Sequence, residues 1–248
     1  MNMRMLVAAL LVGGLVVGNT HASLIGSDYA DNYDPPAWED ESNEGIGFGA
    51  WDMWDDGENS GFFIGSSTAD GHGDINSDGV AFGMFANFNQ WANAQRSITN
   101  WGSGYTFSID MAVNWRDGGR GLSLFGPDGF APEDEFWNIH ISDAGYGDTG
   151  FDFANDIVLS FSITQDGDDL DILITGSSAA DEWSDTWSTT LTGEELGGFR
   201  LYTGGHDIDG AGERNLYFNN LEIIPEPGTM GLLGLALAGL AFYRRRSF

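Results

Sequence analysis

Hydrophobic and polar residues alternate along much of the chain. The clearest run is "YTFSIDMAVNW", residues 105–115, in which an aromatic or aliphatic residue occupies every second position. A period of two predicts a β-strand that buries one face and leaves the other in water. Similar runs occupy residues 80–88, 121–125, 136–141, 157–164, 170–175, 198–203 and 215–224. The pattern therefore predicts a series of short strands.

Turn signals separate these runs. The sequence "QDGDD" at residues 165–169 lies between two of them and predicts a β-hairpin. No stretch carries a helical apolar stripe, although "TGEELGG" at 192–198 could form one helical turn. No repeat of fixed period appears, which argues against a solenoid. The predicted fold is all-β: an antiparallel two-sheet, jelly-roll-like sandwich over residues 61–224, after an irregular acidic lead-in over 23–60.

Both ends of the chain have features of processing signals. At the N-terminus, Arg4 precedes an apolar stretch and Ala22 precedes a small residue, which predicts a signal peptide over residues 1–22. At the C-terminus, residues 225–248 contain an apolar run from 229 to 243. As a helix this run would be about 22 Å long, shorter than the roughly 30 Å core of a bilayer. The sequence thus predicts a signal helix at one end and a short transmembrane helix at the other.

The charge of the chain limits its partners. It has 38 Asp and Glu residues against 9 Lys and Arg, and its formal net charge is −29. Nucleic acids and anionic membrane surfaces are disfavoured because they would be repelled. Cations and neutral polymers such as glycans fit this charge better. The chain has no cysteine, so no disulfide stabilises the fold and no thiol serves as a nucleophile or metal ligand.

Two acidic loops are candidate calcium sites. The loop "GDINSDG" matches the first half of a calcium loop, in which alternate oxygens converge on one ion and glycine permits the turn, but its twelfth position is Phe85. The loop "HDIDGAGE" is the second candidate. The same residue types are common in exposed turns, so that alternative stays open. The candidate Ca²⁺ ligands are Asp74, Asn76, Asp78, Asp207 and Asp209.

Tryptophans are the second candidate chemistry. Sugars lay their apolar C–H faces on aromatic rings while nearby carboxylates and amides bind the hydroxyls. Several tryptophans lie beside acidic residues and outside the predicted strands, and these rings could instead cap the ends of the core. The candidate glycan-binding residues are Trp51, Trp54, Trp101, Trp183 and Trp187.

No motif predicts an enzyme. A glycosidase needs two carboxylates held about 5 to 9 Å apart. The cluster "PEDEFW", residues 132–137, lies in a proline-led turn and not along a strand. Residues His72, His140 and His206 lack metal-ligand spacing, and His140 is predicted to be an exposed sheet residue. We therefore predict a non-catalytic protein, with a glycan-active hydrolase or lyase as the alternative.

Two segments resemble known families. The strands from "YTFSIDMAVNW" to the closing "NLYFNNLEI" resemble the concanavalin-type lectin sandwich, which implies a fold and no activity. The C-terminal tail resembles the PEP-CTERM sorting signal in its proline motif, its Gly/Leu/Ala span and its terminal arginines. The matching residues are Pro225, Glu226, Pro227, Arg244, Arg245 and Arg246.

The second resemblance implies a destination. Exosortase would recognise the tail during transient insertion in the inner membrane of a Gram-negative bacterium. Cleavage would then release the protein to the cell surface or the extracellular matrix, where such proteins accompany exopolysaccharide and biofilm systems. The sequence thus predicts an exported protein that binds or structures extracellular polysaccharide, with calcium as a candidate ligand. A purely structural acidic matrix protein is the other alternative.

Overall fold

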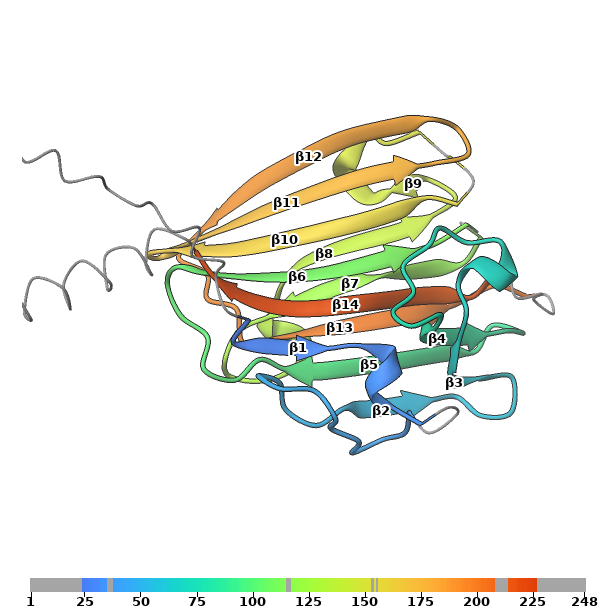
Figure 1. Ribbon diagram of the computed structural model, residues 1–248, viewed down its shortest axis with the longest axis horizontal. Helices are drawn as coiled ribbons and strands as arrows, with labels where there is room; N and C mark the ends of the chain where they lie inside the picture. The colour runs from blue at the N-terminus through green and yellow to red at the C-terminus, as the bar shows by residue number, and fades with distance from the viewer. Residues whose placement is uncertain are drawn as a thin grey trace, which may run out of the picture.

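The computed structural model describes residues 24–34, 38–114, 117–152, 154, 156–207 and 214–226 (Figure 1). These residues form an antiparallel sandwich of two sheets, which confirms the predicted all-β class. The predicted signal helix and C-terminal transmembrane helix lie outside the described residues. Within the described part of the chain, no helix has the length and apolarity needed to cross a membrane.

The first sheet has eight strands. Their order is β12 (Trp183–Thr192), β11 (Asp169–Ser178), β10 (Val158–Asp166), β6 (Tyr105–Ala112), β14 (Leu216–Pro225), β4 (Ala81–Ala86) and β3 (Ser60–Gly65), and β1 (Gly26–Asp28) also pairs with β14. Strand β12 forms the upper edge in Figure 1.

The second sheet has six strands and lies behind the first in Figure 1. Their order is β2 (Asp52–Asp55), β5 (Trp91–Ser97), β13 (Gly198–Gly204), β7 (Gly119–Phe125), β8 (Glu135–Ser142) and β9 (Gly145–Tyr146). Four short 3₁₀ helices, among the described residues, span Ala30–Asn32, Thr68–Asp70, Pro132–Asp134 and Gly147–Thr149.

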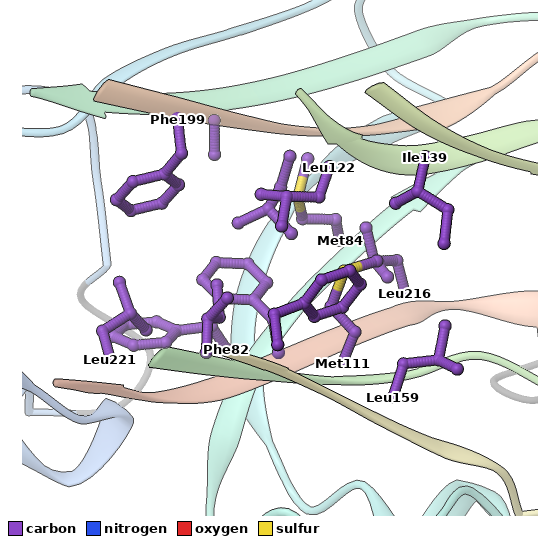
Figure 2. Close-up of a cluster of buried hydrophobic side chains, with 14 of the residues drawn as sticks. Phe82, Met84, Met111, Leu122, Ile139, Leu159, Phe199, Leu216 and Leu221 are labelled. Atoms are coloured by element: carbon purple, nitrogen blue, oxygen red, sulfur yellow. The ribbon is translucent and has the colours of Figure 1, made fainter. Parts of the chain in front are cut away.

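The core lies between the sheets. Figure 2 shows Phe199, Leu122 and Ile139 reaching down from the second sheet towards Phe82 and Met111 of the first. Each of these side chains is almost completely buried, and burying one contributes about 1.5 to 3 kcal/mol. Since side chains alternate along a strand, residues next to these in sequence point to the outer faces of the sandwich.

The eight predicted strands are present, and their ends lie within three residues of the predicted ones. The predicted hairpin joins β10 to β11. The residues of "TGEELGG" form the end of β12 and a turn, and no helix. Strands β1, β2, β3, β5, β9 and β12 were not predicted. Trp183 and Trp187 therefore lie on a regular strand, which corrects the expectation that they occupy loops.

The lead-in at residues 23–60 contributes more to the fold than its irregular sequence predicts. It supplies β1 to the first sheet and β2 to the second, and it inserts Trp38 and Trp51 into the core. It also carries one half of a buried ion pair, in which Asp28 on β1 meets Arg96 on β5, both with side chains 0% exposed. The lead-in thus connects the two sheets.

The buried pair is well supplied with partners. The Tyr33 hydroxyl donates to Asp28 Oδ2 at 2.9 Å, and Arg96 donates to Asn43 Oδ1 and the Gly49 carbonyl. The guanidinium also lies over the rings of Phe48 and Trp51, at 5.1 and 4.9 Å from the ring centroids. Burial raises the pKa of the Asp28 carboxyl, and the positive charge of Arg96 opposes that rise.

Candidate functional site

The outer face of the six-stranded sheet presents two rows of side chains that cross the strands. Pairing register places Trp54, Asn93, Tyr202, Gly121 and His140 side by side on β2, β5, β13, β7 and β8. Two residues further along each strand, a second row consists of Asp52, Gln95, Arg200, Ser123 and Asn138. The first row is mainly aromatic and the second is polar.

Four rings form what we call the aromatic platform: Trp54, Trp91, Tyr202 and His140. Trp54 is 49% exposed, His140 is exposed, and the other two are half-buried. The Tyr202 and His140 rings stack at an interplanar angle of 16° with centroids 5.9 Å apart. The Trp91 ring lies 6.4 Å from the Tyr202 ring. The platform therefore presents three contacting rings on one sheet face, and Trp54 lies in the same row on the far side of Asn93.

Glycines on β7 make room for these rings. A Cβ atom added at Gly121 would clash with the Ile139 carbonyl oxygen and the Tyr202 hydroxyl. One added at Gly119 would lie 2.7 Å from His140 Cε1 and 3.1 Å from Trp91 Cη2, closer than side chains tolerate. The absence of side chains at these two positions lets the rings approach the backbone of the sheet.

Hydrogen bonds hold the Tyr202 ring in place. Its hydroxyl donates to Asn138 Oδ1 at 3.1 Å and shares a hydrogen bond of 2.9 Å with His140 Nδ1. Asn138 donates in turn to the Ser123 hydroxyl at 2.7 Å. Burial raises the pKa of Tyr202 to about 12, so its hydroxyl stays protonated at neutral pH.

The polar row carries both donors and acceptors. Arg200 Nε donates to Gln95 Oε1 at 2.8 Å and Nη2 donates to the Phe130 carbonyl at 2.8 Å. Gln95 in turn donates to Asp52 Oδ2 at 2.5 Å. Burial lowers the pKa of Arg200, and the carboxylates Glu135 and Asp52 oppose that change. Rings beside amides, hydroxyls and a guanidinium are the groups that bind sugars.

The two carboxylates that act on Arg200 are far apart. Asp52 lies on β2 and Glu135 on β8, four strands away in the sheet. At roughly 4.8 Å per strand, their backbones are about 19 Å apart. A glycosidase pair is held within about 9.5 Å. These two carboxylates are therefore too distant to act as a hydrolytic pair.

The structure disperses the five predicted tryptophans. Trp54 lies on the platform, but Trp51 is only 1% exposed and belongs to the core, where its indole donates to the Tyr33 hydroxyl at 3.1 Å. Trp183 packs edge-on against Phe151. Trp187 stacks on Trp137, and Trp101 donates to Gln165 Oε1 at 3.1 Å, so both lie away from the platform.

The first calcium candidate forms a tight hairpin turn. Asp78 and Gly79 both have positive φ, at 43° and 86°, and Ser77 and Val80 exchange two backbone hydrogen bonds of 2.9 and 3.0 Å. This is the geometry that an Asp-Gly pair favours between strands. The side-chain oxygen of Asn76 accepts from the Ser67 amide at 2.9 Å, and its nitrogen donates to Asp74 at 3.0 Å.

Only part of the second calcium candidate belongs to the described residues. Asp207 is exposed, whereas Asp209 lies outside the described residues. Across the described ranges, no three His, Cys, Asp or Glu residues gather in a group that could hold a metal ion. Calcium binding thus stays a prediction of the sequence.

Two cavities lie next to each other on the surface. One of about 450 Å³ is lined by Gly102, Ser103, Gln165, Gly167, Asp168, Gly193, Glu194 and Glu195. The other, of about 510 Å³, shares the last three of these residues and is lined further by residues 126–128 and 133–136. Acidic groups dominate both, and only Phe136 supplies a ring. The platform therefore has more of the ring surface that sugars require than either cavity has.

Sequence reasoning missed most of the platform. Trp91 and Tyr202 have no distinctive neighbours in the sequence, and His140 was predicted only to be exposed, as it is. The available signal was that Asn138 and His140 alternate with the buried Ile139 and Ile141 on β8. That alternation places two polar side chains on an outer face without showing which residues join them.

Comparison with protein families identifies the C-terminal segment. Residues 224–246 match the PEP-CTERM protein-sorting motif, as the tail's resemblance predicted. This match implies processing by exosortase, with export and sorting to the cell surface. Among curated proteins, the comparison finds no relative of the chain.

Solved structures resemble the body of the chain only distantly. The winged bean acidic lectin, complexed with methyl-α-D-galactose, matches 70% of this chain and 97% of its own at 10% identity and a TM-score of 0.37. A family 11 carbohydrate-binding module from Clostridium thermocellum matches 71% and 89% at 11% identity and a TM-score of 0.28. The bacteriophage CBA120 tailspike protein 4 domain matches 71% of this chain at 12% identity and a TM-score of 0.36, and the chain spans 19% of its length. A lectin is thus among the solved structures that the body of the chain distantly resembles.

Proposed function

We propose that this protein is an exported, non-catalytic surface protein that binds extracellular polysaccharide through the aromatic platform. The observation that carries the proposal is the cross-strand row in which Trp54, Tyr202 and His140 lie on one face of the second sheet. Aromatic faces take up the apolar C–H surface of a sugar ring, and the polar row beside them supplies donors and acceptors for hydroxyls.

The charge of the chain supports a neutral or weakly charged glycan. At a formal net charge of −29, a polyanion would be repelled at long range, whereas the ring and hydrogen-bond contacts of a neutral sugar are insensitive to that field. The platform rests on several antiparallel strands, so its rings are held in position before a ligand arrives. Such preorganisation reduces the entropic cost of binding.

A non-catalytic role fits the arrangement of acids. Asp52 and Glu135, the two carboxylates that act on Arg200, stand about 19 Å apart by strand spacing, and sugar hydrolysis needs a pair within about 9.5 Å. Hydrolase or lyase activity is the competing function, and release of reducing ends from the bound polysaccharide would establish it. A purely structural matrix protein is the other competitor, and it would bind no glycan.

Replacing Trp91 by Ala tests the platform. We expect the variant to bind the polysaccharide of the producing cells roughly tenfold more weakly, because it removes a ring that lies 6.4 Å from Tyr202. Binding would be measured by glycan array and calorimetry on the exported protein. Trp101→Ala is the matched control, since Trp101 bonds to Gln165 away from the platform and should leave affinity unchanged.

Two outcomes would contradict the platform. The first is that no polysaccharide binds the wild-type protein. The second is that Trp101→Ala weakens binding as much as Trp91→Ala, which would place the ligand elsewhere.

The same titrations in the presence of a chelator test whether calcium takes part. An unchanged affinity and an unchanged melting temperature would remove Ca²⁺ from the proposal.

The sorting tail gives a separate prediction. Strand β14 ends at Pro225, Glu226 is the last described residue, and the matched motif covers residues 224–246. In cells lacking exosortase, we expect the chain to keep its tail and stay with the membrane fraction. Mass spectrometry of the C-terminus and fractionation would measure this. Normal maturation in those cells would refute the assignment of exosortase as the processing enzyme.

A further inference from the structure

Among the described residues, the sandwich has one long sheet edge that lacks the usual protection. Unpaired strand edges attract other strands, and proteins blunt them with short strands, charges, prolines or bulges. Strand β2 has four residues, two of them acidic, β9 has two residues, and β3 has six. Strand β12 has ten residues, "WSDTWSTTLT", with no proline and only one charge, Asp185. In a chain of net charge −29, so neutral an edge is unusual.

Strand β12 is also regular. It pairs with β11 without interruption from Asp169↔Thr192 to Ser178↔Trp183, so no bulge bends it away from a neighbour. Its other side has no strand partner among the described residues. The edge is therefore long, free of bulges and without a paired strand on its outer side.

Alternate residues of β12 direct their backbone groups away from β11. The Gly193 amide donates to the Asp168 carbonyl at 2.8 Å, which continues the ladder through the odd-numbered positions. The even-numbered groups consequently point outwards, and the Thr186 amide is occupied by the neighbouring Asp185 carboxylate at 2.8 Å. The residues with outward backbone groups are Ser184, Thr186, Ser188, Thr190 and Thr192.

We propose that two copies of this chain pair through β12, antiparallel and about a two-fold axis at Ser188, so that their eight-stranded sheets become one continuous sheet. In this register Thr186 faces Thr190 of the second copy, and Ser184 faces Thr192. Every outward pair then joins two hydroxyl residues, a combination that stabilises antiparallel neighbours. Five such residues in each copy would exchange about ten backbone hydrogen bonds, two of which require the Asp185 carboxylates to release the Thr186 amides.

Charge permits this contact at ordinary ionic strength. The two Asp185 carboxylates would lie six positions apart along the joined strands, or about 20 Å, beyond the screening length of about 8 Å. The net charge of −29 on each copy opposes association over longer distances. Dimerisation should consequently strengthen with added salt. The aromatic platform is on the other sheet, so this pairing neither needs it nor covers β5 or β13.

Replacing Ser188 by Lys tests the pairing. Antiparallel pairing would place the two new ammonium groups opposite each other, which disfavours the contact even though each copy becomes less negative. Ser162→Lys is the matched control. Ser162 lies in the middle of the sheet on β10, and its side chain is on the same outer face of the sheet as that of Ser188. By sedimentation of the exported protein, we expect wild type and Ser162→Lys to be dimers and Ser188→Lys to be a monomer at the same concentration.

Hydrogen exchange on the unmodified protein supplies a second readout. On dilution to monomer, the amides of Ser188 and Thr190 should lose protection, while those of Trp187 and Thr189, which pair with β11, should keep it. A wild-type monomer at all salt concentrations would overturn the proposal. A dimer that survives Ser188→Lys, or that leaves Ser188 and Thr190 unprotected, would overturn it as well.

Discussion

Replacing Arg96 by Met is expected to lower the free energy of unfolding by about 3 to 5 kcal/mol, as is typical when one partner of a buried pair is removed. The change leaves Asp28 without its positive partner at a position that is 0% exposed. It also removes the donors that bind Asn43 and the Gly49 carbonyl in the lead-in. Urea unfolding of wild type and variant measures the difference.

Two comparisons separate the ion pair from general effects of losing an arginine. Arg200→Met removes a half-buried arginine whose partners are the neutral Gln95 and Phe130 carbonyl groups, so it should cost less than Arg96→Met. Adding Asp28→Asn to Arg96→Met removes the stranded charge while keeping a side chain that Tyr33 can bond, so the double variant should regain part of the stability. If Arg96→Met and Arg200→Met lower the free energy of unfolding equally, the buried ion pair contributes no more to stability than the half-buried arginine does.

The local period of the sequence predicts much of the fold. Strands β6 and β10 alternate buried and half-buried residues over most of their length, and both were predicted with ends within three residues of those observed. Strand β5 was missed because its inner face carries Ala92, Ala94 and the charged Arg96, a set with no apolar alternation. A buried charge is recognisable only when its partner is known, and Asp28 lies 68 positions away.

Strand β12 was missed for a different reason. Its inner face includes the polar Asp185 and Thr189, which interrupt the apolar alternation, and its other inner residues are only partly buried because it is an edge strand. The hairpin at Asp78-Gly79 shows the reverse case, in which a local motif suggested a ligand site. In the structure the Asp-Gly pair forms a turn, because both residues have positive φ and they are the two-residue connection of a hairpin. Asp and Gly serve both purposes, so the sequence leaves the choice open.

The candidate site depends on register between distant segments. Trp54, Tyr202 and His140 become neighbours only because β2, β13 and β8 belong to one sheet, in an order that the sequence does not give. The role of the glycines of β7 can be recognised only from the structure, which shows that Gly121 lies under the Tyr202 hydroxyl. Individual strands could thus be predicted from local pattern, whereas a surface assembled across five strands could not.

The lead-in places one tryptophan in the core and another on the surface. Their replacement by Ala should therefore differ strongly in its effect on stability. Trp51 is 1% exposed and packs on Phe82, Phe199 and Phe218, so Trp51→Ala opens a cavity and should lower the free energy of unfolding by about 3 to 5 kcal/mol. Trp54 is 49% exposed on the platform, so Trp54→Ala should change stability by no more than about 0.5 kcal/mol.

Binding should show the reverse order. Trp54→Ala removes a ring from the platform and is expected to weaken polysaccharide binding by about tenfold, which corresponds to about 1.4 kcal/mol. Trp51→Ala should leave the affinity of the folded fraction close to that of wild type, when titrated well below its lowered melting temperature. The two residues are three positions apart in one segment, so they serve as controls for each other. If Trp51→Ala abolishes binding in protein that is still folded, and Trp54→Ala does not, the sugar-binding surface cannot be the outer face of the second sheet.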